Sequence, residues 1–386
     1  MKTAGDTMRS GAVVAAGCLA LLCSAAVRAT DQATCSADEI RRIVAPGPWP
    51  LPAVRDPSNR VSGNPAAIAL GEGLFFSPRL SGTGGVLCAS CHEPWRALTD
   101  GRPRAFGLEF VDRNTPTLAN VRLNRWFGWD GSNDNLWAQS IRPLLEPREM
   151  NSTAARIGEL VRSDPALSGG FEKAFGAKPP ADDAAVLAGV GKVLAAYEET
   201  LASGRTPFDD FRDALARGDS GAAASYPERA RRGLKIFLGK AGCDSCHGGP
   251  NFTDGAFHRT GIASLLRNGE PDKGREDGIR KLIANPFNLL GPYNDDPGRG
   301  SAAGTRKASG EADTAGAFRT PSLRNAALTA PYMHDGSVAT LCDIARGHPA
   351  RAPELSGGER EDLVAFLATL TESGSRSAPE TNPPCP

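Results

Sequence analysis

The stretch VLCASCHEP covers residues 86–94 and places Cys88 and Cys91 three positions apart, with His92 directly after them. The same arrangement, CDSCH, returns at residues 243–247. Cys-x-x-Cys-His is the attachment pattern of c-type haem, in which both thiols bond to the porphyrin and the histidine that follows ligates the iron. The sequence therefore predicts two covalently bound c-type haems, held by Cys88, Cys91 and His92 and by Cys243, Cys246 and His247.

A Cys-x-x-Cys pair alone also suits a redox dithiol, half of a zinc site or part of an iron–sulfur site. Paired zinc knuckles would lie close together in the sequence, whereas these two motifs are far apart. An iron–sulfur site would need more cysteines in one run, and it would give neither histidine a role. The haem interpretation uses all six residues.

The N-terminus predicts an exported protein. Lys2 and Arg9 precede the apolar segment Gly11–Val27, and Ala29 ends a plausible cleavage site, so residues 1–29 are interpreted as a signal peptide. A retained membrane anchor is the alternative, but the segment is short for a span. We expect a periplasmic protein without a membrane span in the mature chain. The net charge of zero gives no indication of a nucleic-acid partner.

Three cysteines lie outside both the signal segment and the two haem motifs: Cys35, Cys342 and Cys385. An oxidising compartment permits one disulfide among them and leaves one cysteine over. The sequence does not choose the pair.

The fold class is predicted as mainly α: two cytochrome c-like haem domains packed together, rich in loops. Apolar periodicity predicts helices over Pro65–Phe76, Asn135–Leu145, Thr153–Arg162, Asp182–Ser203, Pro227–Leu238 and Gly358–Thr371. A weak repeat, with Gly73-Leu74-Phe75-Phe76 before the first motif and Gly233-Leu234-Lys235-Ile236-Phe237 before the second, supports equivalent domains. We place these domains at residues 30–204 and 222–373, with a tail at 374–386, and expect residues 294–317 to form a surface loop.

Four segments carry a resemblance to a known family. They are LFFSPRLSGTGGVLCASCHEPWRALTDGRP (74–103), RNTPTLANV (113–121), FGWDGSNDNLWAQSIRPLLEPREM (127–150) and FRTPSLRNAALTAPYMHDGSVATL (318–341). In this order they resemble the bacterial di-haem cytochrome c peroxidase and MauG-like family. The resemblance implies a first haem that activates hydrogen peroxide and a second, six-coordinate haem that relays electrons.

The family resemblance also implies roles for residues around the first haem. Some members block its open face with a histidine from the following loop, and here that position falls at about Leu108. We therefore expect a five-coordinate haem with His92 as its axial ligand, open without prior reduction. Glu149 matches the family's acid–base residue and Gln139 its hydrogen-bonding partner.

Two further features follow from the resemblance. Trp129 matches the tryptophan that the family places between its haems, where an oxidisable indole can relay electrons. A calcium ion lies between the domains in this family, and its matching ligands are Asn114 through the side chain and Thr329 and Pro331 through their carbonyls.

The second haem's distal ligand departs from the pattern. Peroxidases of the family have a methionine there and MauG-like members a tyrosine, but an ungapped count from His334 reaches His348. We predict two histidine ligands, His247 and His348, with Met333 as the alternative for the distal position. His258 and His334 are interpreted as haem-environment residues rather than ligands.

Three functions are compatible with these residues, and the first is preferred to the other two. The first is a cytochrome-c peroxidase-like oxidoreductase that takes electrons from a small cytochrome c or cupredoxin. The second is a MauG-like oxidase that modifies residues of an oxidisable partner protein, which the missing methionine and missing blocking histidine favour. The third is a non-catalytic di-haem electron-transfer protein, which would need six ligands at both irons.

Overall fold

The structure is a computed structural model that describes residues 35–259, 261–348, 354–374 and 385. It confirms the mainly α class, since helices dominate and the described residues contain one two-stranded sheet. The predicted signal peptide lies outside the described residues. The helices are α2 (Ala37–Val44), α3 (Pro65–Phe75), α4 (Leu136–Leu145), α5 (Ala154–Ser163), α6 (Pro165–Phe175), α7 (Asp183–Glu198), α8 (Pro207–Ala216), α9 (Ser220–Ala224), α10 (Glu228–Leu238), α11 (Arg275–Ala284), α12 (Ala303–Ala308), α13 (Leu341–Gly347) and α14 (Gly357–Ala368).

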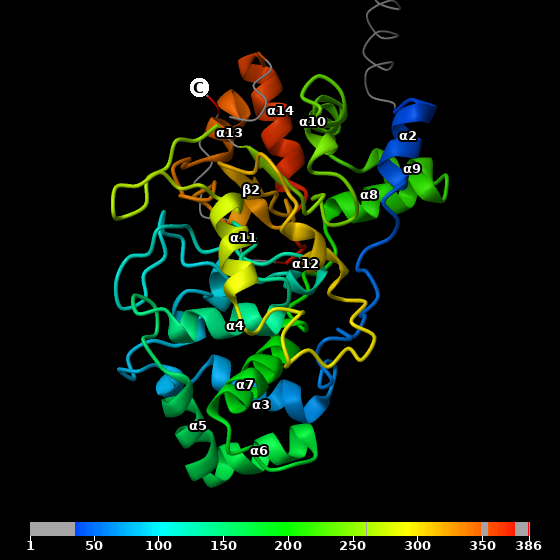
Figure 1. Cartoon of the computed structure of the whole chain (residues 1–386). Coiled ribbons are helices and arrows are strands. Elements are labelled where there is room, and N and C mark those ends of the chain that lie inside the picture. Colours follow the sequence, from blue (N-terminus) through cyan, green and yellow to red (C-terminus); the bar gives the residue numbers. More distant parts are fainter. Residues whose placement is uncertain (1–34, 260, 349–353, 375–384, 386) are drawn as a thin grey trace, which may run out of the picture.

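The first hydrophobic core forms around α7, which α3, α4, α5 and α6 surround (Figure 1). α7 is apolar on nearly every face, so it is buried along most of its length. α3 crosses α7 at Gly71, where a Cβ atom would lie 2.0 Å from the carbonyl oxygen of Val193. Only glycine permits this close approach of the two backbones.

The second core forms around the pair α10 and α14 (Figure 1). Here Gly233 occupies the crossing, because a Cβ atom on it would lie 1.8 Å from the carbonyl oxygen of Asp362. Gly71 and Gly233 each precede a buried phenylalanine by four positions, Phe75 and Phe237. The structural repeat therefore pairs Gly233 with Gly71 and not with Gly73, which faces open space.

Two short segments extend from one half of the chain to the core of the other. Ile43 on α2 belongs to the second core, and α2 lies beside α8 and α9 in Figure 1. Phe287 belongs to the first core although it follows α11. The domain limits at 30–204 and 222–373 stay predictions. Each core nevertheless includes a residue from the other half of the chain, Ile43 in the second core and Phe287 in the first.

The region after α11 connects the two halves rather than forming a plain surface loop. Lys192 on α7 is buried, and its Nζ donates to the carbonyl oxygen of Tyr293 at 2.7 Å and pairs with Asp295 Oδ2 at 2.6 Å. Asp134 accepts the hydroxyl of Thr305 at 2.5 Å. The segment also contains α12, which the sequence analysis did not anticipate.

The sheet consists of β1 (Phe257–Arg259) and β2 (Ala317–Arg319), which are antiparallel and pair Phe257 with Arg319. Its importance lies in its position, since both strands contribute to the wall of the second haem cavity described below. None of the described helices combines the length and the apolar character that a membrane span requires.

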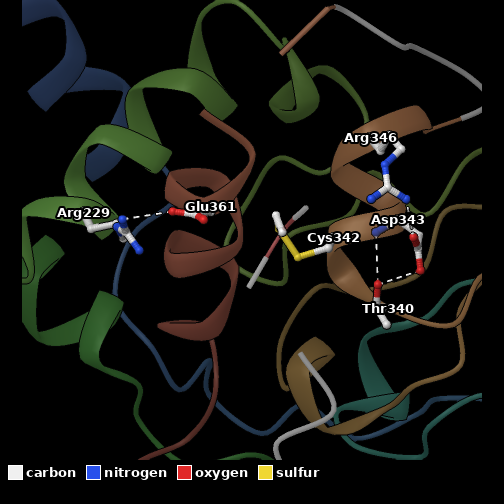
Figure 2. The surroundings of a disulfide bond; sticks show 7 residues. Arg229, Thr340, Cys342, Asp343, Arg346 and Glu361 are labelled. Carbon is white, nitrogen blue, oxygen red and sulfur yellow. Dashed lines mark hydrogen bonds and ion pairs between the residues drawn. A yellow bond between two sulfur atoms is a disulfide. The ribbon is translucent and has the colours of Figure 1, made fainter. Parts of the chain in front are cut away.

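One disulfide joins Cys342 to Cys385, with the two Cα atoms 5.3 Å apart (Figure 2). The structure thus selects the pair that the sequence left open, and Cys35 remains outside it. Cys342 lies in the first turn of α13, so the bridge ties the chain near its C-terminus to the helix that ends next to His348.

Candidate haem sites and the region between them

Both Cys-x-x-Cys-His motifs adopt the same local structure. Each begins with a short 3-10 turn, at Cys88–Ser90 and at Cys243–Ser245. In each the backbone N–H of the histidine donates to the carbonyl of the first cysteine, at 3.0 Å for His92 and 2.8 Å for His247. This turn places both thiols and the imidazole in one compact unit.

The two imidazoles are oriented as metal ligands require. Nδ1 of His92 lies 3.0 Å from the carbonyl oxygen of Leu98, and Nδ1 of His247 lies 3.3 Å from that of Phe252. A proton on Nδ1 satisfies each carbonyl and leaves the lone pair of Nε2 for iron. Burial lowers the pKa of His92, and it lowers that of His247 to about 4, so both rings are neutral at pH 7. The residues present therefore fit a c-type haem at each motif.

A cavity of about 630 Å³ lies against the second motif. His348, the residue that ends α13, faces His247 across it with ring centroids 6.4 Å apart and planes at 83°. Two imidazoles that share one metal at about 2 Å from each nitrogen have ring centres roughly 6 Å apart. The observed spacing therefore suits one iron between His247 and His348.

The other distal candidates are placed as follows. Met333 lines the same cavity, while Met150 is buried in the first core. Tyr332 also lines the cavity, and its hydroxyl donates to the carbonyl oxygen of Ala326 at 3.0 Å. His348 is the one of these residues whose ring is placed opposite His247.

Glu149 lies close to the first motif. Its carboxylate pairs with Arg142 of α4 at 2.8 Å and counteracts the effect of burial on the pKa of His92. The backbone N–H of Leu108 donates to the carbonyl oxygens of Arg148 at 2.9 Å and Glu149 at 3.2 Å. The backbone at Leu108 is thus held against the segment that carries Glu149.

Gln139 extends from the middle of α4. Its Oε1 accepts a hydrogen bond from Asn133 Nδ2 at 2.9 Å, and Asn133 in turn accepts one from Asn285 at 2.9 Å. With Oε1 engaged, the Nε2 amino group is the part of Gln139 that can donate to a bound oxidant.

Trp129 lies at the junction of the two halves. Its indole Nε1 donates to the carbonyl oxygen of Asn114 at 2.9 Å, and its own carbonyl accepts from the backbone N–H of Arg319 at 2.8 Å. The indole also borders the cavity that contains His247. A side chain from the segment before α4 therefore reaches the second haem site.

The three calcium-ligand candidates line that same cavity. Asn114 is buried and donates its Nδ2 to the carbonyl oxygen of Arg102 at 2.8 Å, which turns Oδ1 the other way. Thr329 and Pro331 come from the segment after the turn Ala326–Leu328. All three residues therefore line one cavity, together with His247.

Three charged or titratable residues of this region were not assigned roles by sequence reasoning. Arg142, the ion-pair partner of Glu149, was missed. Arg319 lines the second cavity and is 6% exposed. His334, read only as a haem-environment residue, is 1% exposed and stacks on Phe318 with ring centroids 3.5 Å apart. His258, by contrast, pairs with Asp254 at 2.7 Å.

Two Cys-x-x-Cys-His turns, each next to its own helical core, define the class of di-haem c-type cytochromes. Residues 65–217 match the di-haem cytochrome c peroxidase family. The methylamine utilization protein MauG of Methylorubrum extorquens is 36% identical over 320 residues, covering 79% of this chain and 78% of that protein. The cytochrome c551 peroxidase of Pseudomonas aeruginosa is 32% identical over 308 residues, covering 78% of each.

A solved structure agrees with these relatives. The crystal structure of a MauG-like protein associated with microbial copper homeostasis superposes with a TM-score of 0.63 at 28% identity, covering 87% of this chain and 99% of that one. The chain therefore belongs to the family of di-haem cytochrome c peroxidases and MauG proteins. It is an oxidoreductase of the di-haem peroxidase type, and this family implies two haems.

Proposed function

We propose that this chain is a periplasmic peroxidase that reduces hydrogen peroxide to water with electrons from a small cytochrome c or cupredoxin. The observation that carries the proposal is the arrangement at the first motif. Glu149, held by Arg142, lies beside the haem-binding turn, and Leu108 stands where some family members have a blocking histidine. In the proposal, that arrangement leaves the position without a blocking histidine and provides a carboxylate to handle the protons of the oxidant.

The first haem, when bound, would supply the iron chemistry by which peroxide is reduced. In the proposal Cys88 and Cys91 tether this haem and His92 provides its axial nitrogen. The hydrogen bond from Nδ1 of His92 to the carbonyl of Leu98 fixes the ring, so that Nε2 keeps a constant orientation.

Glu149 acts as the acid–base group. Its carboxylate accepts the proton from one peroxide oxygen and delivers it to the other, which leaves as water. Arg142 holds the carboxylate in place through the 2.8 Å ion pair. Gln139 orients the oxidant through its Nε2 amino group, because Asn133 fixes its Oε1.

Electrons enter through the second haem site and pass Trp129. Cys243, Cys246 and His247 would hold the second haem, with His348 as the distal ligand, which the 6.4 Å spacing of the two rings supports. Two imidazoles generally give a lower potential than a methionine and a histidine. The second site is thus suited to relaying electrons more than to storing them at high potential.

Calcium is part of the proposal as a structural ion between the two halves. Asn114 would bind through Oδ1, and Thr329 and Pro331 through their carbonyl oxygens, which are the hard ligands that Ca²⁺ prefers. All three residues line one cavity, which supports this assignment. Waters would complete the shell.

A steady-state assay with peroxide and reduced cytochrome c tests the proposal, starting from the fully oxidised holoprotein. We expect turnover without prior reduction. Activity that appears only after one-electron reduction would contradict the open first site. No turnover at all, despite a rapid spectral change with peroxide, would overturn the peroxidase proposal.

A MauG-like oxidase is the second candidate. The relative named MauG, 36% identical to this chain, and the histidine in place of a methionine favour it. In that case the oxidising equivalents would pass to residues of a partner protein. Peroxide-dependent oxidation of a partner, with no oxidation of cytochrome c, would distinguish it. A spectrum with only low-spin iron in the oxidised protein would instead favour electron transfer without catalysis.

A further inference from the structure

Arg319 is a buried cation in the wall of the second haem cavity. It ends β2 and lines the cavity together with His247. Among the described residues, its side chain donates to neutral oxygens at long range: Gly128 O at 3.3 Å, Asn124 Oδ1 at 3.4 Å and Thr320 O at 3.4 Å. A guanidinium paired with a carboxylate makes shorter contacts, at about 2.7–2.9 Å. These contacts therefore do not supply the counter-charge that the group needs.

The other buried arginines provide an internal comparison. Within the described part of the chain, each of them forms an ion pair with a carboxylate: Arg212 with Asp213, Arg275 with Glu311 and Arg324 with Asp209. Arg319 is equally buried, yet no ion pair with a described carboxylate exists for it. Three of the four buried arginines are therefore neutralised by an acidic side chain. Arg319 is the fourth, and its counter-charge has to come from a group other than a described carboxylate.

A buried guanidinium needs a counter-charge for a general energetic reason. Removing a cation from water costs several kcal/mol unless a counter-charge and hydrogen bonds offset the loss. Burial lowers the pKa of Arg319 to about 10, which still leaves the group charged at pH 7. The calcium ion proposed on the same wall would add further positive charge. An anion in the cavity would supply this counter-charge.

We propose that Arg319 binds a propionate carboxylate of the second haem and is its internal counter-cation. A haem carries carboxylates on an otherwise apolar ring, and it is the group that the two cysteines hold against this cavity. The proposal rests on the second haem of the proposed function, but it does not depend on peroxide turnover.

The same contacts give Arg319 a position in the electron path. Its backbone N–H donates to the carbonyl of Trp129 at 2.8 Å, and its Nε donates to that of Gly128. A propionate on this guanidinium is anchored beside the segment that carries the indole. Arg319 is therefore a cofactor-binding residue that also fixes the edge of the haem next to Trp129.

The test compares midpoint potentials of the second haem in the holoprotein, by spectroelectrochemical titration at several pH values. Arg319→Gln should lower the potential, because an uncompensated propionate favours ferric iron. It should also make the potential depend on pH near neutrality, as the propionate begins to take up a proton. Arg319→Lys, which keeps the charge, should restore most of the potential.

Arg259→Gln is the matched control, since Arg259 also lines the cavity but is exposed and paired with Asp313. It should leave the potential unchanged. An Arg319→Gln protein with the wild-type potential and pH dependence overturns the proposal.

A crystal structure of the wild-type holoprotein decides the question even where the glutamine variant does not mature. A haem carboxylate oxygen about 3 Å from the guanidinium supports the proposal, and a guanidinium that contacts only protein overturns it. Both the potential measurements and the crystal structure test the role of Arg319 even if the peroxidase assay shows no turnover.

Discussion

Two side chains, Glu149 and His348, carry the chemistry proposed for the two haem sites. Each is positioned by neighbours far away in the sequence or by the end of a helix. Glu149 depends on Arg142 and on the backbone of the loop at Leu108. His348 depends on the length of α13, because it is the residue that ends this helix.

Glu149→Gln tests the proton transfer. The amide cannot accept the peroxide proton, so we expect kcat with peroxide to fall by about 10²-fold or more. Haem content should stay unchanged, as measured by the pyridine haemochrome spectrum. Glu146→Gln is the control, because Glu146 pairs with Arg148 rather than Arg142. Normal turnover by the Glu149 variant would remove this residue from the mechanism.

His348→Ala tests the ligand of the second haem. Losing one imidazole should convert that iron from low-spin to high-spin, which electron paramagnetic resonance of the oxidised protein detects. His258→Ala serves as the control, since His258 lines the same cavity but pairs with Asp254. A low-spin signal that survives in the His348 variant would transfer the ligand role to another residue, with Met333 the first to examine.

At the scale of elements, two glycine crossings build the two cores. α3 meets α7 at Gly71, and α10 meets α14 at Gly233, in each case with backbone against backbone. Because these helices precede the haem motifs, the crossings set where each Cys-x-x-Cys-His turn begins. A glycine at a helix crossing thus helps to position both Cys-x-x-Cys-His turns.

Gly71→Ala should destabilise the first core. The added methyl would clash with the carbonyl of Val193, and overpacking of this kind costs about 1–3 kcal/mol. Gly73→Ala, two positions along the same helix, faces open space and should be neutral or stabilise by up to about 1 kcal/mol through helix propensity. Thermal unfolding of the two variants measures the difference. Equal effects at both positions would show that the crossing is not tight.

At the scale of the whole molecule, Arg113 joins the two halves. It pairs with Asp130, which precedes α4, and with Asp272, which precedes α11, both at 2.7 Å. Burial would raise the pKa of Asp130, but Arg113 and Lys281 outweigh this effect and lower it to about 2. The pKa of Asp272 is lowered as well, where Arg113 again overcomes burial.

These lowered values predict a loss of stability in acid. A carboxylate with a depressed folded-state pKa stabilises the protein above its unfolded pKa and loses this effect as the pH falls through the folded one. For Asp130 the window runs from about pH 4 to pH 2 and involves roughly 2 kcal/mol. Chemical denaturation followed by circular dichroism across this range measures the change.

Asp272→Asn should destabilise the protein at pH 7 and make the acid transition shallower. Asp313→Asn removes a carboxylate from an exposed pair with Arg259 and should cost less than about 1 kcal/mol. Identical acid transitions in the wild type and the Asp272 variant would show that the junction does not depend on these charges.

Local sequence was sufficient for the features whose chemistry is local. Covalent attachment needs two cysteines and a histidine at fixed spacing, so both haem motifs could be identified without a fold. The helices α3, α4 and α14 were predicted within a few residues of their observed ends. The helices α2, α6, α8, α9, α11, α12 and α13 were not among those predicted. For the shortest of them, α9 and α12, packing supplies the stability that so few turns cannot provide by themselves.

The remaining features depend on tertiary contacts. The pairing of Cys342 with Cys385 could not be predicted, because it depends on the chain near residue 385 returning to α13. The alignment of Gly233 with Gly71 in the internal repeat became clear only from the helix crossing at Gly71. The sequence by itself determined the two haem attachment points. Only the tertiary structure brought His348 opposite His247 and left Arg319 buried without an acidic partner, because both facts depend on distances between segments that no local pattern encodes.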